Sequence, residues 1–221
     1  MRRMCVLVGL LAACGAARAD DYYVTVFTAE SVPFRSTNTH AFASLVRVPA
    51  TGGAPVLHDI AWAPANMHVR GITLAPEAGA NFSLTTTLDW VRDSGWRVSA
   101  WGPYRVEREL YEKLKAQSEW LSSGKVKYKP TDNFMPRGVA VNCYHALTHP
   151  VAPLKRYAGA FTCGDAAGTL VLQCYKPWLI DPCKTHDEIL TVIGADKYQL
   201  ARRSFDYHPG RIDAIRSAVG R

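Results

Sequence analysis

The front half of this 221-residue chain alternates apolar and polar residues, and this pattern limits the fold more than any other feature. Gly and Pro clusters divide the alternation into four segments, which cover residues 22–29, 40–48, 56–62 and 68–74. Successive side chains of a β-strand point to opposite faces, so a period of two is typical of a half-buried strand. The pattern therefore predicts antiparallel strands joined by hairpins.

The clearest helical pattern lies at residues 105–122, where apolar side chains recur every three or four residues. Its predicted core-facing stripe consists of Val106, Leu110, Leu114 and Leu121. Further helices are predicted at 84–92, from Asn142 or Cys143 to Pro150, and at 186–193, with strands at 96–101, 126–128 and 168–180. The Arg-rich tail is predicted to lie on the surface. Strands, helices and then more strands indicate one α+β domain over residues 20–221, with an antiparallel sheet packed with helices.

The N-terminus has the pattern of a secretory signal segment. Arg2 and Arg3 precede an apolar run at residues 4–13, and residues 17–19 (ARA) then form a small-x-small cleavage pattern. The run is too short to span a bilayer as a helix, so residues 1–19 are predicted to be removed. Residues 11–14 (LAAC) also resemble a lipobox, in which the leader ends before Cys14 and Cys14 is lipidated. Both readings predict a periplasmic, secreted or envelope-anchored protein, with membrane contact only through a lipid on Cys14.

Charge and missing motifs exclude several function classes. Removing residues 1–19 lowers the formal net charge from +7 to +4, and no dense Lys/Arg run is present, so nucleic acid is not an expected partner. The chain has no Gly-x-Ser-x-Gly elbow, Walker loop, dinucleotide glycine fingerprint or His-Glu-x-x-His motif. We therefore expect no cofactor and no nucleotide.

Four cysteines follow the leader, and in an oxidising compartment four cysteines indicate two disulfides first. They are Cys143, Cys163, Cys174 and Cys183. None has Cys-x-x-Cys or zinc-ligand spacing, so we expect no structural metal. Metal binding by His40, His58 and His68 is a weak third reading, because their spacing matches no ligand pattern.

Cys143 has a second interpretation as a nucleophile. It follows a β-like run at residues 138–141 and opens a helical segment, where unpaired backbone N–H groups stabilise a thiolate and an oxyanion. Such a thiol needs an imidazole as its base and a third group to orient that imidazole. His40 begins one predicted strand and His58 lies in the next, so adjacent antiparallel strands are predicted to place both imidazoles beside Cys143.

The segment 142–145 (NCYH) resembles the Asn-Cys-x-His signature of lecithin retinol acyltransferase-like proteins, which belong with the circularly permuted papain-like, NlpC-type thiol enzymes. The order also matches: a histidine starts one strand (HAFASLV), a second lies in the next (VLHDIAWAP), and the cysteine comes much later. The segment HDIAWAP is also similar to an I-S-W-L-P segment of exported bacterial proteins. The resemblance implies a permuted papain-like fold with Cys143 as nucleophile, His40 as general base and His58 as the orienting residue. Asn142 and His145 would support them.

Two functions follow from these readings. The first is an exported cysteine hydrolase or acyl-transfer enzyme of amidase, peptidase or esterase type, which acts on a cell-wall peptide or a lipid ester through a Cys143 acyl-enzyme. The alternative is a non-catalytic envelope binding or structural domain whose cysteines form disulfides. Trp90, Trp96, Trp101 and Trp178 are aromatic candidates for its contacts.

Overall fold

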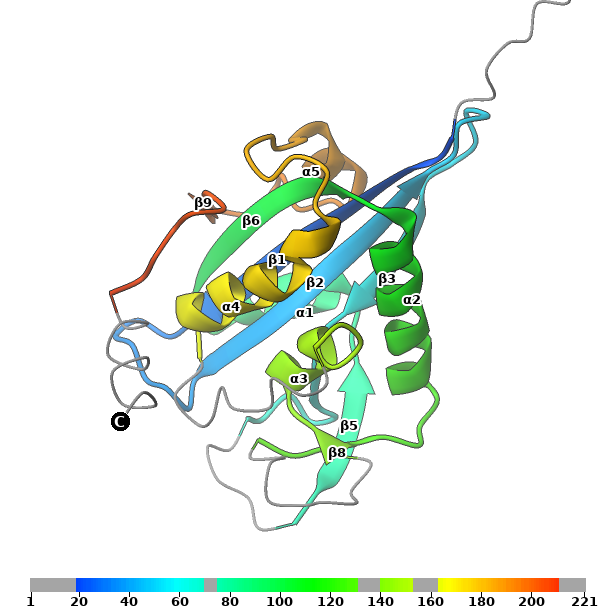
Figure 1. Cartoon of the computed structure of the whole chain (residues 1–221). Coiled ribbons are helices and arrows are strands. Elements are labelled where there is room, and N and C mark those ends of the chain that lie inside the picture. The colour runs from blue at the N-terminus through cyan, green and yellow to red at the C-terminus, as the bar shows by residue number, and fades with distance from the viewer. Residues whose placement is uncertain (1–18, 70–74, 131–139, 153–162, 211–221) are drawn as a thin grey trace, which may run out of the picture.

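The computed structural model describes residues 19–69, 75–130, 140–152 and 163–210, and shows a mixed α+β fold with two sheets (Figure 1). The larger sheet has five strands in the order β3-β2-β1-β6-β9. These strands are β1 (Asp21–Glu30), β2 (Thr39–Val48), β3 (Val56–Ile60), β6 (Arg97–Val106) and β9 (Leu200–Arg203). The α+β class predicted from the sequence is confirmed.

Both sheets are mixed, which corrects the expectation of an antiparallel sheet. In the larger sheet β9 runs parallel to β6, whereas the other neighbouring strands pair antiparallel. The smaller sheet has the order β4-β5-β7-β8, and its last pair is parallel. Its strands are β4 (Trp62–Pro64), β5 (Glu77–Asn81), β7 (Lys127–Tyr128) and β8 (Ala140–Val141). Two parallel strands must be joined by a long connection. The alternation within one segment does not show in which direction its strand will pair, so the sequence could not predict the parallel pairs.

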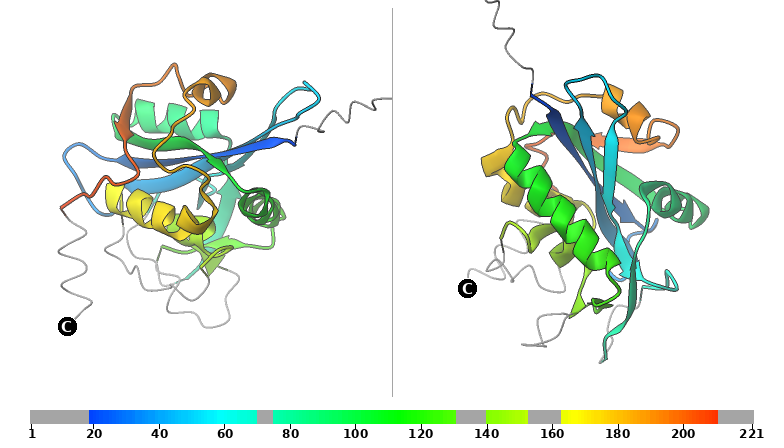
Figure 2. Two further views of the ribbon diagram at one scale, coloured as in Figure 1. Left: turned by 45° about the horizontal axis from the view of Figure 1, so that its top comes forward. Right: turned by 90° about the vertical axis from the view of Figure 1, so that its right-hand side faces the viewer.

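Helices cover both faces of the larger sheet (Figures 1 and 2). We call the two sides the α1 face and the α3 face. The α1 face is covered by α1 (Leu84–Asp93) and α5 (Glu188–Val192). The α3 face is covered by α2 (Arg108–Ser122), α3 (Cys143–Thr148) and α4 (Asp165–Tyr175).

Each face of the sheet has its own apolar core, because the strands bury side chains in both directions. Leu45 belongs to the core of the α3 face, and its neighbour Val46 belongs to the core of the α1 face. The same division separates Val26 from Phe27 on β1. In β1 and β2, which face a residue reaches is therefore fixed by whether its number is odd or even.

The predicted helices at 84–92 and 105–122 are both present. α1 begins after Ser83, whose side chain accepts a hydrogen bond from the Thr86 N–H, as a helix N-cap should. α2 begins only at Arg108, because β6 continues beyond Gly102-Pro103 to Val106. Gly102 has a φ of +81°, a conformation that favours glycine, at the bulge where β6 shifts register against β1. Val106 is thus buried on a strand and not on the helix.

Residues 168–180 were expected to form a strand, and this expectation is wrong. Residues 168–178 lie in α4 and in the 3-10 turn Lys176–Trp178 that follows it, and Leu179 forms only an isolated bridge with Val106. Most of α4 is buried, and a short, continuous apolar run fits a buried helix as well as a buried strand. Only packing between the sheet and its neighbours decides between them.

Three smaller expectations concern the Arg-rich tail, residues 68–74 and the leader. The described part of the Arg-rich tail includes β9, which lies at the sheet edge and is partly exposed, in line with the predicted surface position. The strand expected at 68–74 falls partly on residues 70–74, outside the described residues, and the observed strand here is β5. The leader and Cys14 also lie outside the described residues. Within the described part of the chain, no helix is both long enough and apolar enough to cross a membrane.

Candidate functional site

Cys143 is the first residue of α3 and directly follows β8 and the cap residue Asn142. The Asn142 side chain accepts a hydrogen bond from the His145 N–H at 2.7 Å and donates one to the Pro130 carbonyl at 3.2 Å. The cap thus fixes where the helix begins and ties it to the end of β7. Cys143 itself is half-buried.

α3 packs on the α3 face of the sheet, mainly against β2. Ala41 and Ala43 of β2 belong to this core, and their small side chains allow the helix to approach closely. His145 is buried, and its ring lies 5.4 Å from that of Tyr144. The position of Cys143 at a helix start, after a strand, is as predicted.

His40 lies on β2 and points to the α1 face. Its ring stacks on Phe42 at 5.4 Å and meets Trp90 of α1 edge-on at 6.0 Å. The side chain is 2 % exposed, and its Nδ1 has no hydrogen-bond partner among the described residues. Burial in this apolar site lowers the pKa of His40 from 6.5 to about 4, because desolvation disfavours the imidazolium.

His58 lies on β3 opposite Leu45, and therefore points to the α3 face. Its ring meets Tyr111 of α2 at 6.0 Å. Burial lowers the pKa of His58, and the nearby Lys115 lowers it further. Its neighbour Asp59 points the other way, where its carboxylate accepts a hydrogen bond from the Leu84 N–H at 2.8 Å and burial raises its pKa.

The structure does not bring the three predicted site residues together. His40 lies on the α1 face, whereas His58 and Cys143 lie on the α3 face. His58 also pairs five residues along β2 from His40, a separation of about 16 Å at the usual strand rise. The side-by-side imidazoles expected from the sequence are therefore wrong, because period-two alternation puts Ala41, and not His40, toward α3. The same separation prevents His40 and His58 from sharing a metal ion.

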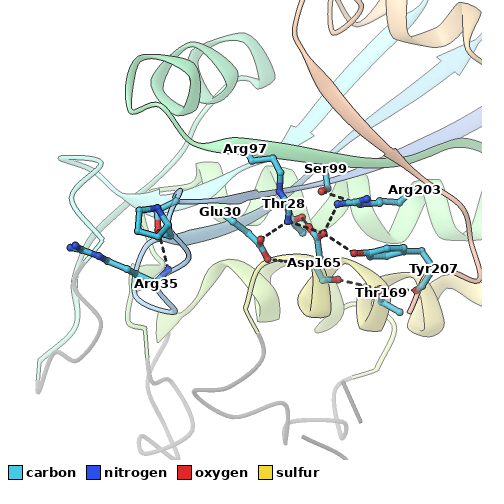
Figure 3. Close-up of polar contacts among 11 residues, drawn as sticks. Thr28, Glu30, Arg35, Arg97, Ser99, Asp165, Thr169, Arg203 and Tyr207 are labelled. Carbon is cyan, nitrogen blue, oxygen red and sulfur yellow. Dashed lines mark hydrogen bonds and ion pairs between the residues drawn. The ribbon is translucent and has the colours of Figure 1, made fainter. Parts of the chain in front are cut away.

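A network that the sequence did not reveal surrounds Asp165, at the start of α4 (Figure 3). Asp165 is 1 % exposed, and its carboxylate accepts hydrogen bonds from Thr28, Arg97, Arg203 and Tyr207 at 3.0 to 3.3 Å. It therefore joins β1, β6, β9 and the segment after β9. No sequence pattern marked it, and the residues that follow it, 168–180, were assigned to a strand.

Glu30 completes this network from the end of β1. Its carboxylate accepts hydrogen bonds from the Asp165 N–H at 2.8 Å and from Arg97 at 2.5 Å (Figure 3). Gly164, with a φ of +58°, lies so close that a Cβ there would be 1.9 Å from the Glu30 Oε1. Two carboxylates face two guanidinium groups, so the charges balance and the acceptors are filled. This arrangement fits a structural anchor better than a reactive site.

The remaining candidates form no further centre. Within the described ranges, no group of three His, Cys, Asp or Glu side chains is placed to hold a metal ion. Cys163 is half-buried before α4, Cys174 is buried within it, and Cys183 is exposed. No protein-family model, curated protein or solved structure matches this chain.

Proposed function

We propose that this chain is an exported envelope domain that binds a cell-wall peptide or a lipid ester without cleaving it. One observation carries the proposal: the sheet separates the imidazole of His40 from Cys143. A thiol nucleophile needs a base within hydrogen-bond reach, and His40 is enclosed by Phe42 and Trp90 on the opposite face. The low pKa of His40 also leaves it a weak base.

Export and a permuted papain-like scaffold are part of the proposal. Export is supported by the charged start, short apolar run and Ala-x-Ala pattern of residues 1–19. The scaffold is supported by the order of elements, since two strands with histidines precede a helix that begins at Cys143 and packs against the first of them. In this proposal Cys143 occupies the position that the nucleophile has in such a scaffold, but the His40 imidazole lies on the opposite face of the sheet and cannot act as its base.

A thiol hydrolase or acyltransferase is the second candidate, and the position of Cys143 favours it. Cys143 opens α3 behind an Asn142 cap and is half-buried, which is the setting of an activated thiol. In this case a group other than His40 must take the thiol proton. The acyl-enzyme would then form by attack of the thiolate on an amide or ester carbonyl, with loss of the amine or alcohol.

Binding and turnover measured together distinguish the two functions. The mature protein is mixed with isolated cell walls or with phospholipid vesicles, co-sedimentation measures binding, and mass spectrometry of the supernatant measures released product. A binding domain co-sediments equally as wild type and as Cys143→Ala, and releases nothing. Product that is lost in Cys143→Ala and kept in the exposed control Cys183→Ala would overturn the proposal in favour of the enzyme. Absence of binding to both materials would also overturn it.

A further inference from the structure

Polar side chains gather where the ends of β1, β2 and β3 lie under α2. Arg47 of β2 pairs with Tyr22 on one side and with Val56 on the other, which makes it a diagonal neighbour of His58. Tyr111 of α2 lies over these strands, with its ring 4.9 Å from Tyr22 and 6.0 Å from His58. One guanidinium, one imidazole and two phenols therefore lie together at one end of the α3 face.

Charges around this cluster act on both His58 and Tyr111. Burial raises the pKa of Tyr111, and Arg47 and Lys115 oppose that rise. Burial and then Lys115 and Arg47 lower the pKa of His58, while Glu119 and Asp59 act in the opposite direction. Arg47 and Lys115 therefore oppose a positive charge on the imidazole and favour a negative charge on the phenol.

Within the described residues, Arg47 has no carboxylate at hydrogen-bond distance, unlike the cations of the Asp165 network and of α2. Arg97 and Arg203 contact carboxylates at 2.5 to 3.1 Å in the Asp165 network. Lys115 contacts Glu119 at 2.6 Å. The carboxylate nearest to Arg47 in a described ion pair belongs to Asp20, at 3.9 Å from Nε, a separation too long for a hydrogen bond.

Two polar atoms of the cluster have unused hydrogen-bonding capacity. The Arg47 Nε and the His58 Nε2 are shielded from solvent, and neither has a hydrogen-bond partner within the described part of the chain. A shielded polar atom without a partner destabilises the protein, and a ligand oxygen removes that cost. The backbone positions of diagonal neighbours in a sheet lie about 7 to 8 Å apart, close enough for two long side chains to direct donors at the two oxygens of one carboxylate.

We propose that Arg47, His58 and Tyr111 form a binding site for a carboxylate group, with Tyr22 and Lys115 at its rim. The inference rests on the proposed binding function, for which the ligand is the free carboxylate of a cell-wall peptide. The Arg47 guanidinium donates to the carboxylate, His58 donates from Nε2, and the two tyrosine rings contact the apolar part of the ligand. The side chain of Arg47 is 41 % exposed, so the outer part of its guanidinium can be reached from solvent.

A titration followed by NMR tests the site directly. The mature protein is titrated with N-acetyl-alanyl-alanine and, separately, with its C-terminal amide. We expect the acid to shift the His58 ring resonances with saturation and to raise the pKa of His58, because an adjacent anion favours the imidazolium. The amide should cause neither change. Equal responses to acid and amide, or no response to either, would overturn the site.

Two variants sharpen the test. Arg47→Met keeps an apolar stem but removes the guanidinium, and should weaken acid binding at least about tenfold. Lys113→Met removes a cation from α2 that pairs with Glu109 and lies over the Trp178 ring, and should leave affinity unchanged. An unchanged dissociation constant in Arg47→Met would refute the site.

Co-sedimentation with isolated cell walls separates this inference from the proposed function. If wild type and Arg47→Met bind cell walls equally, the carboxylate site is wrong and the binding function stands. If the dipeptide acid titrates His58 but neither cell walls nor vesicles are bound, the site stands and the function is wrong. Binding to cell walls that is lost in Arg47→Met and kept in Lys113→Met supports both.

Discussion

His40 and Cys143 lie on opposite faces of the five-stranded sheet, although the sequence predicted that both imidazoles, His40 and His58, would lie beside Cys143. The two residues are separated because successive residues of β2 face opposite ways. Ala41 faces α3, and its neighbour His40 therefore faces away from Cys143. The consequence is a histidine that serves packing against Phe42 and Trp90 and whose main effect should be on stability.

The first prediction concerns the pH dependence of unfolding. The folded-state pKa of His40, about 4, lies below the value of 6.5 expected for the unfolded chain, so the unfolded state binds more protons between these values. The free energy of unfolding should therefore rise with pH from about 4 to 6.5, and His40 should account for about 3 kcal/mol of that rise. Urea unfolding at a series of pH values measures it.

Replacing His40 by Leu isolates this contribution from the carboxylates that titrate in the same range. The difference in unfolding free energy between wild type and His40→Leu should change with pH by about 3 kcal/mol. His68→Asn, at an exposed position, is the control and should follow wild type. A pH-independent difference between wild type and His40→Leu would contradict the buried, neutral imidazole.

The second prediction concerns the anchor around Asp165. Asp165→Asn removes a buried charge that faces Arg97 and Arg203, and should lower the free energy of unfolding by about 3 kcal/mol. Because β9 is held through Arg203, its amides should also exchange with deuterium faster in the variant. Asp196→Asn changes an exposed carboxylate and should alter neither measurement. Unchanged exchange in β9 would show that the network does not hold the strand.

The third prediction concerns the contact between α4 and the sheet. A Cβ on Gly168 would lie 2.5 Å from the Trp101 ring, so Gly168→Ala forces the helix away from β6. Overpacking of this kind should lower the free energy of unfolding by about 1 to 3 kcal/mol and change the near-UV signal of the tryptophans. Gly53→Ala is a matched control, because its Cβ would meet only Pro49 at an ordinary 3.7 Å. Equal stability of the two variants would contradict this packing.

The fourth prediction concerns the start of α1. Ser83→Ala removes the side chain that accepts the Thr86 N–H, and should lower the free energy of unfolding by about 1 kcal/mol. Thr85→Ala changes an exposed residue in the same turn without touching the cap, and should be neutral or slightly stabilising. A neutral Ser83→Ala would mean that another group satisfies this helix end.

Local pattern was sufficient for much of the fold. Alternation predicted β1, β2 and β3, the 3.6-residue period predicted α2, and the helix start at Cys143 followed from the strand before it. These elements depend on interactions between residues close in the chain, such as the cap of Asn142 on His145.

The tertiary structure alone decided the site. Alternation states that neighbouring residues face opposite ways, but it does not state which face will receive α3, so it could not separate His40 from Cys143. The Asp165 network depends on contacts such as that with Thr28, 137 residues away in the chain. The helical state of residues 165–175 likewise depends on packing, since the Trp101 ring occupies the space that a side chain at Gly168 would need. Local periodicity fixes the direction of a side chain relative to its own element, whereas the partner it meets depends on how distant elements pack.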